Sequence, residues 1–122
     1  MKKIFIIIFT LISFNAFAVD KSTTFTNDLF KQAQLEGKTV VINSWEKTCT
    51  TCKRQIKILD KAQKEFVDIL FLSFEQTVDK DIAKQLNINY WTTIVIYKNN
   101  KEIYRSIGQT EKIKIYEAIK SL

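Results

Sequence analysis

Two cysteines, Cys49 and Cys52, are the residues of this 122-residue chain whose type and spacing could do chemistry. They enclose two threonines, and thiols this close together can form a disulfide and exchange it with another disulfide. The chain has no histidine, which excludes a Ser-His-Asp triad and a histidine-containing zinc site. Two cysteines cannot supply the four ligands of a structural zinc site on their own. We therefore predict no metal and no separate cofactor, with the Cys49–Cys52 disulfide as the redox-active group.

The elements on either side of the cysteines decide how the pair would work. Residues 39–45 form a short β-branched run typical of a buried strand, and residues 53–66 place apolar side chains at helical spacing. The pair thus falls where a strand gives way to a helix, and the unpaired N–H groups of a first helical turn favour a thiolate. Lys53 adds positive charge there. We predict that Cys49 attacks first and that Cys52, one turn further on, faces inward and resolves the mixed disulfide.

Three other interpretations of the cysteines remain open from these patterns. A purely structural disulfide would close so short a loop that it contributes little stability through chain entropy. Two unrelated buried cysteines would not be expected at a strand-to-helix junction. A metal site shared by two chains would need the thiols of both copies. A CxxC beside a strand–helix–strand unit favours redox chemistry over all three.

The rest of the chain predicts one α/β domain. Besides the strand and helix above, we expect a helix that starts at Thr26 and ends at Gly37, a strand over 68–74, a short helix over 79–86, strands over 92–98 and 102–107 joined by a turn at Asn99 and Asn100, and a closing helix over 111–122. Strands separated by helices indicate a parallel core, and the late hairpin adds an antiparallel pair. The composition shows no low-complexity segment and no second-domain boundary.

The N-terminus indicates export. Lys2 and Lys3 precede an apolar run, and Ala16-Phe17-Ala18 matches the small-x-small cleavage pattern of a secretory signal peptide. We expect a signal peptide over 1–18, cleavage near Ala18, and a domain over 19–122 in the periplasm or outside the cell. The alternative is that the segment stays as an uncleaved anchor. The net charge of +6 comes from basic residues scattered among acidic ones, so we predict no nucleic-acid binding.

Several segments together resemble the thioredoxin family. The matching residues are Val40-Val41-Ile42, Trp45, Cys49-x-x-Cys52-Lys53, Ile58-Leu59-Asp60, the segment from Thr93 to Asn99, and Gly108. The resemblance covers essentially the whole chain after the N-terminal segment. It implies a thioredoxin-like fold, with a central mixed β-sheet flanked by helices, and thiol–disulfide exchange with protein substrates. It also implies Cys49 as nucleophile, Cys52 as resolving thiol, and Trp45, Lys53 and Asn43 as active-site support.

The sequence departs from the family pattern at three places near the site. Thr50-Thr51 replaces Gly-Pro between the cysteines, so the redox potential cannot be transferred from the family. Asn43 stands where the family has a buried acid, and an amide cannot take up a proton at neutral pH. Thr92 stands where the family has a cis-proline facing the disulfide; the resemblance makes Trp91, Thr92 and Thr93 the substrate-binding segment. Because a non-proline cis peptide costs about 3–4 kcal/mol, we predict a trans Trp91–Thr92 bond and a rearranged loop.

These observations predict an exported, monomeric protein-disulfide oxidoreductase. Its partners would be cysteine-containing exported proteins and a membrane-bound electron donor or acceptor. The family's exported thiol oxidases usually carry a histidine between the cysteines and an inserted helical domain, and the absence of both from this sequence favours a reductant. Two alternatives stay open: a thiol oxidase, and a redox-inert module that uses the same scaffold to bind a protein.

Overall fold

The computed structural model describes residues 23–121. The expected signal peptide over 1–18 and its cleavage position near Ala18 therefore lie outside the described residues. Within the described part of the chain, no helix combines the length and the apolar character needed to cross a membrane.

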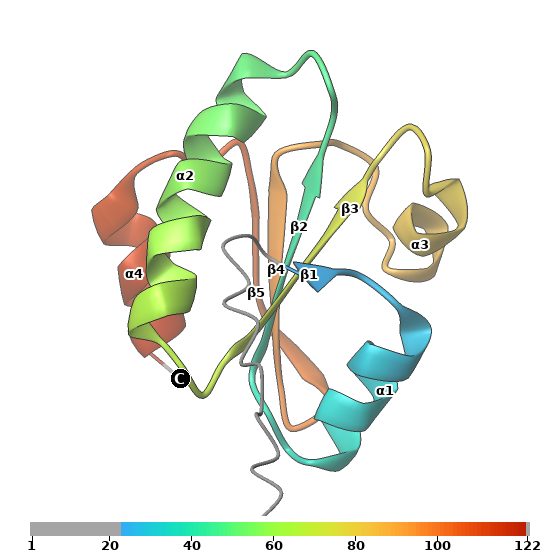
Figure 1. The fold of residues 1–122 in the computed structure, drawn as a ribbon, viewed down its shortest axis with the longest axis vertical. Helices are drawn as coiled ribbons and strands as arrows, with labels where there is room; N and C mark the ends of the chain where they lie inside the picture. Colours follow the sequence, from blue (N-terminus) through green and yellow to red (C-terminus); the bar gives the residue numbers. More distant parts are fainter. Residues whose placement is uncertain (1–22, 122) are drawn as a thin grey trace, which may run out of the picture.

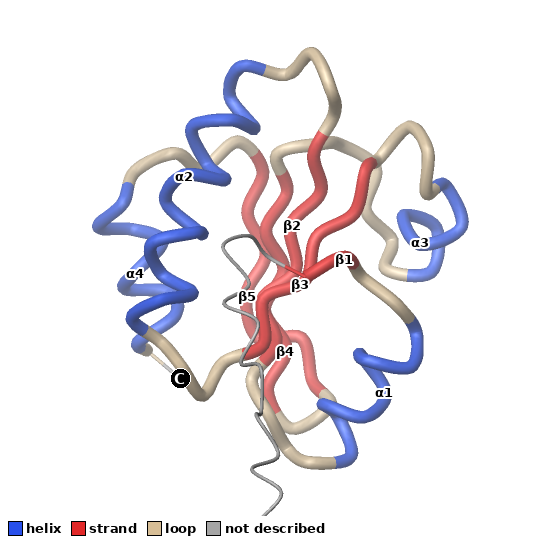
Figure 2. The backbone as a smooth tube through the Cα atoms, in the orientation of Figure 1, coloured by secondary structure: helices blue, strands red, loops and turns tan. Residues whose placement is uncertain are grey.

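A single mixed sheet forms the centre of the molecule (Figures 1 and 2). Its strands lie in the order β1-β3-β2-β4-β5, with β1 and β2 parallel to β3 and with β4 antiparallel to both β2 and β5. The strands are β1 (Thr23–Thr24), β2 (Val40–Trp45), β3 (Leu70–Glu75), β4 (Thr93–Lys98) and β5 (Lys101–Ile107). The helices are α1 (Asn27–Leu35), α2 (Thr50–Glu65), α3 (Lys80–Gln85) and α4 (Lys112–Lys120). The predicted mixed sheet flanked by helices is confirmed.

Each face of the sheet is covered by two helices because successive strand side chains point to opposite faces. In Figure 1, α2 and α4 lie on one side of the sheet and α1 and α3 on the other. Val40 and Ile42 pack with the buried residues of α1 and α3, whereas Val41 between them packs with those of α2 and α4. Apolar residues therefore pack on both faces of the sheet, so each buried polar side chain within it needs a structural explanation.

Local sequence signals set where the elements begin and end. The Thr26 side chain caps α1 by accepting a hydrogen bond from the Leu29 N–H at 3.2 Å. At the other end Gly37 has a φ of 68°, and the Lys38 N–H closes the helix on the Ala33 carbonyl. Asn99 and Asn100 have φ values of 50° and 65°, which suit the two-residue turn that joins β4 to β5. The predicted turn residues therefore do what their types favour.

Most elements end within two residues of the predicted bounds, and two differences from the sequence prediction have a structural reason. Helix α2 begins at Thr50 rather than at residue 53, because Cys49 itself serves as its N-cap. Strand β1 was not predicted, since two residues are too short to show an alternating pattern. The first of these differences places the cysteines inside the first turn of α2.

Candidate active site

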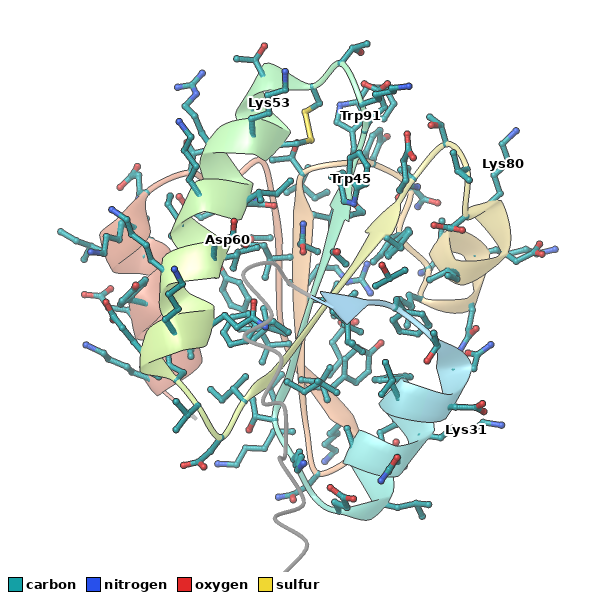
Figure 3. All side chains as sticks on the ribbon, viewed as in Figure 1. Lys31, Trp45, Lys53, Asp60, Lys80 and Trp91 are labelled. Atoms are coloured by element: carbon teal, nitrogen blue, oxygen red, sulfur yellow. A yellow bond between two sulfur atoms is a disulfide. The ribbon has the colours of Figure 1, made fainter. Side chains whose placement is uncertain are left out.

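The two cysteines are bonded to each other at the N-terminal end of α2 (Figure 3). Cys49 is half-buried, whereas Cys52 is 1% exposed. The Cys52 N–H donates a hydrogen bond to Cys49 Sγ at 3.0 Å, so a backbone donor of the first helical turn already faces this sulfur. The reachable sulfur therefore lies where the helix N-terminus favours negative charge, and the second sulfur lies behind it.

The loop between β2 and α2 is fixed by Glu46. Its carboxylate accepts hydrogen bonds from the Thr48 N–H at 3.0 Å and from the Thr48 hydroxyl at 2.6 Å, and its carbonyl accepts one from the Cys49 N–H at 3.1 Å. Lys47 within this loop and Lys53 in the first turn of α2 are both exposed. The Glu46 carboxylate is thus hydrogen-bonded within the loop, and the Lys47 and Lys53 ammonium groups are exposed to solvent.

Thr92 reaches the disulfide from the loop before β4. Its hydroxyl oxygen lies 3.0 Å from Cys52 Sγ and 3.3 Å from Cys49 Sγ, and the residue is 4% exposed. No cis peptide bond occurs in the described residues, which confirms the trans Trp91–Thr92 prediction. Thr92 instead has a φ of 62°, a left-handed conformation that is unusual for a β-branched residue. The rearranged backbone turns the threonine side chain onto both sulfurs.

Gln55 holds Thr92 in place, and sequence reasoning missed it. Its Nε2 donates to the Thr92 carbonyl at 3.1 Å and to the Gln109 carbonyl at 2.9 Å, and the residue is fully buried. From the helical pattern of α2 alone, Gln55 is expected to be one of the polar residues between the apolar positions. The available signal was its place one turn after Cys52, on the face that α2 turns toward the sheet.

A hollow of about 360 Å³ opens beside Cys52. Its walls come from β1, β2, β3 and the start of α2, and its lining residues are Thr24, Trp45, Glu46, Lys47, Cys52, Lys53, Ile56 and Ser73. Trp45 is half-buried and forms part of this wall close to the disulfide (Figure 3). The predicted support residues Trp45 and Lys53 thus line the same hollow as the resolving cysteine.

Asn43 occupies the centre of the sheet on β2. It is 2% exposed, lies opposite Ser73 of β3 in the strand register, and its Nδ2 donates to no group of the described residues. A buried neutral amide therefore stands at the position where the family has a buried acid. Glu75, two residues further along β3, is half-buried and pairs with Trp45 in the register.

The three residues predicted to bind substrate have different environments. Trp91 is 47% exposed and directly precedes Thr92, whose hydroxyl lies at the two sulfurs. Thr93 is buried, and its hydroxyl donates to the Tyr90 carbonyl at 2.7 Å, a carbonyl that Ser44 also binds at 3.0 Å. Trp91 is therefore an exposed aromatic residue of the active-site loop, Thr92 contacts the sulfurs, and Thr93 stabilises the loop from inside.

The described residues contain no group of three or more cysteine, aspartate or glutamate side chains that could hold a metal ion. What the site can do is exchange a disulfide. A half-buried sulfur at a helix N-terminus can attack or be attacked, and a shielded sulfur three residues later can displace whatever is bound to it.

Comparison with known proteins agrees with this chemistry. The family model described as Thioredoxin matches residues 18–121. A thioredoxin of Mycoplasma genitalium is 35% identical over 80 residues, which cover 66% of this chain and 78% of that protein. A thioredoxin of Mycoplasma pneumoniae is 30% identical over 80 residues, with the same two coverages of 66% and 78%.

Solved structures show the same fold. The crystal structure of Trxlp from Edwardsiella tarda superposes with a TM-score of 0.75 at 24% identity, covering 79% of this chain and 95% of that one. The oxidised form of mitochondrial thioredoxin 3 from Saccharomyces cerevisiae gives a TM-score of 0.72 at 24% identity, with coverages of 83% and 95%. Family match, relatives, fold and the bonded Cys49–Cys52 pair agree, and the chain belongs to the thioredoxin family of protein-disulfide oxidoreductases.

Proposed function

We propose that this protein is exported and reduces disulfides in other exported proteins, with electrons that a membrane-bound donor supplies. The observation that supports the exchange role is the placement of Cys49 at the α2 N-cap with Cys52 shielded behind it. Export rests on the sequence pattern of residues 1–18. The partners would then be cystine-containing proteins of the periplasm or the cell exterior, where disulfides persist.

The reaction would proceed in two displacements. The Cys49 thiolate attacks one sulfur of a substrate cystine, forming a mixed disulfide and releasing the other substrate sulfur as a thiolate that takes a proton from solvent. Cys52, as a thiolate, then attacks Cys49 Sγ. The Cys49–Cys52 bond forms, the second substrate sulfur leaves with its electron pair, and the substrate has gained two electrons. Trp91 is exposed and directly precedes Thr92, the residue at the sulfurs, so it would offer an apolar contact to the substrate chain.

Two features of exported thiol oxidases are missing from the described residues, and this supports a role as reductant. No histidine stands between the cysteines, and in the described range α2 leads directly through a short loop to β3 without an inserted helical domain. The redox potential of the Cys49–Cys52 couple tests this direction. Equilibration with glutathione or dithiothreitol buffers should give a value near about −270 mV for a reductant, whereas a value near about −120 mV would identify a thiol oxidase.

Export and partner class are tested separately by trapping. Expressed with its own N-terminal segment, a Cys52→Ser variant should accumulate mixed disulfides through Cys49, and these should be found with exported proteins after cell fractionation. The Cys49→Ser/Cys52→Ser double variant is the matched control and should trap none. Recovery of the protein and its mixed disulfides only in the cytoplasm would refute export, while leaving the exchange chemistry intact.

A further inference from the structure

We infer that the Thr92 hydroxyl is a catalytic hydrogen-bond donor that stabilises the thiolate of whichever cysteine carries the charge, and that Gln55 positions it. The inference depends on thiol–disulfide exchange at Cys49 and Cys52, and on neither export nor the direction of electron flow. It assigns to the residue at the family's proline position a role that a proline, which lacks a hydroxyl, cannot have.

The geometry places one hydroxyl between two sulfurs. Thr92 Oγ1 is 3.0 Å from Cys52 Sγ and 3.3 Å from Cys49 Sγ, both within hydrogen-bond distance for sulfur. A threonine hydroxyl has one proton to donate, so it can serve one sulfur at a time. Because a hydrogen bond to a charged acceptor is stronger than one to a neutral acceptor, the hydroxyl should turn toward the ionised sulfur.

The backbone at Thr92 is held in a conformation that a β-branched residue adopts only at a cost. A left-handed conformation is unfavourable for a residue other than glycine, and such strain persists where the surroundings determine it. Three hydrogen bonds do so here: the Thr92 N–H donates to the Ser44 carbonyl at 2.9 Å, and the Thr92 carbonyl accepts from the Gly108 N–H at 2.8 Å and from Gln55 Nε2 at 3.1 Å. These bonds come from β2, α2 and the end of β5, so the hydroxyl is fixed from three directions.

The other side chains near the cysteines are less suited than Thr92 to donate a hydrogen bond to a buried sulfur. Asn43 on β2 is buried, and within the described residues its amide Nδ2 has no hydrogen-bond partner. The charged side chains that line the hollow beside Cys52 are Glu46, Lys47 and Lys53. Glu46 is bound to Thr48, and both lysines are exposed to solvent. The hydroxyl of Thr92 is the buried side-chain donor in contact with both sulfurs.

The donor would act at both displacements without being consumed. Before the first step it donates to the Cys49 thiolate and raises the fraction of protein ready to attack. After the mixed disulfide has formed, Cys49 is neutral and the hydroxyl turns to Cys52, whose proton has left to solvent through the adjoining hollow. Cys52 then attacks Cys49 Sγ, the substrate thiolate leaves, and Thr92 keeps its own proton throughout.

Thr92→Val removes the hydroxyl and keeps the branched shape, and Thr92→Ser keeps the hydroxyl. In the reduced protein, thiolate absorbance at 240 nm against pH should show a higher Cys49 pKa in the valine variant and a nearly unchanged one in the serine variant. The rate of disulfide reduction at pH 7 should fall about tenfold or more in the valine variant, since a hydrogen bond to a charged group corresponds to at least that factor. Gln55→Met should shift the Cys49 pKa in the same direction by displacing Thr92.

Thr92→Gly guards against misfolding of the valine variant, because glycine adopts a φ of 62° without strain and also lacks the hydroxyl. It should show the same rise in the Cys49 pKa as Thr92→Val. The inference is overturned if the valine or, should that variant not fold, the glycine variant keeps the wild-type pKa and rate. It is equally overturned if Thr92→Ser loses as much as Thr92→Val, because the hydroxyl would then not be the group that matters.

Discussion

At the scale of single residues, Asn43 is a buried neutral amide at the position where the family has an acid. Asn43 is 2% exposed, and its Nδ2 has no acceptor in the described residues. A carboxylate at this position would have no cation opposite it in the strand register, since its partners there are Ser73 and Ile94. The chain therefore carries a neutral side chain where a charge would be costly.

Asn43→Asp should destabilise the protein at neutral pH. Burial disfavours the charged form and raises the pKa of the new carboxyl above the unfolded value of about 3.9. With a raised pKa in the folded state, stability is fully present below pH 3.9 and is lost as the pH rises through the folded pKa. Relative to wild type, urea unfolding should show little change at pH 3.5 and a loss of about 1–3 kcal/mol or more at pH 7.

Asn43→Leu is the matched control for that experiment. It removes the amide without adding a titratable group, so its difference from wild type should be the same at both pH values. An aspartate variant as stable as wild type at pH 7 would contradict the description of this site as unable to hold a charge.

The chemistry-bearing residues could be predicted from sequence, and their neighbours could not. Cys49 and Cys52 are marked by their spacing and by the strand and helix around them. Gln55 has no such mark, because its importance comes from carbonyls of Thr92 and Gln109, which are 37 and 54 positions away in the chain. Contacts of this separation depend on how β4 and β5 pack against α2, which local patterns do not specify.

At the scale of elements, two glycines end their segments in the same conformation but have different neighbours. Gly37 follows α1 with a φ of 68°, and Gly108 follows β5 with a φ of 76°. A Cβ atom at Gly37 would lie 3.4 Å from Asn99 Oδ1, and one at Gly108 would meet no atom within 4 Å. The Gly108 N–H binds the Thr92 carbonyl at 2.8 Å, so only the second glycine touches the active-site loop.

Gly37→Ala and Gly108→Ala should therefore have equal effects on stability and unequal effects on catalysis. Each places a side chain in the left-handed region and should cost about 1 kcal/mol in chemical denaturation. Insulin reduction by dithiothreitol should slow measurably in the Gly108→Ala protein, because relaxation of that strain displaces the Thr92 carbonyl, and should be unchanged in the Gly37→Ala protein. Equal rates in both variants would show that the end of β5 does not position Thr92.

The types and order of the main elements followed from the sequence, and their exact boundaries did not. The apolar periodicity of α2 becomes clear at residue 53, after the polar first turn that contains the cysteines. The structure starts the helix at Thr50, because the Cys49 sulfur accepts the hydrogen bond that a capping side chain would accept. Strand β1 is defined by its pairing with β3, a tertiary contact that cannot be predicted from a two-residue sequence.

At the scale of the whole molecule, three segments that are far apart in the sequence meet at one end of the strands. The loop after β2 and the start of α2 carry the cysteines, the loop before β4 carries Trp91 and Thr92, and Gly108 follows β5. The strand order places β4 next to β2, which is why segments more than 40 residues apart share one site. The fold thereby exposes one sulfur, encloses the other, and leaves an aromatic side chain exposed in the loop that contacts them.

The most direct test of this account is the reactivity of the two thiols in the reduced wild-type protein. Alkylation with iodoacetamide across a pH series, with the modified residue identified by mass spectrometry, gives the pKa and accessibility of each. We expect Cys49 to react first, with a pKa below the value of about 8.5 for an ordinary thiol, and Cys52 to react much more slowly. A Cys49 that titrates at or above that value, or that reacts more slowly than Cys52, would contradict the account.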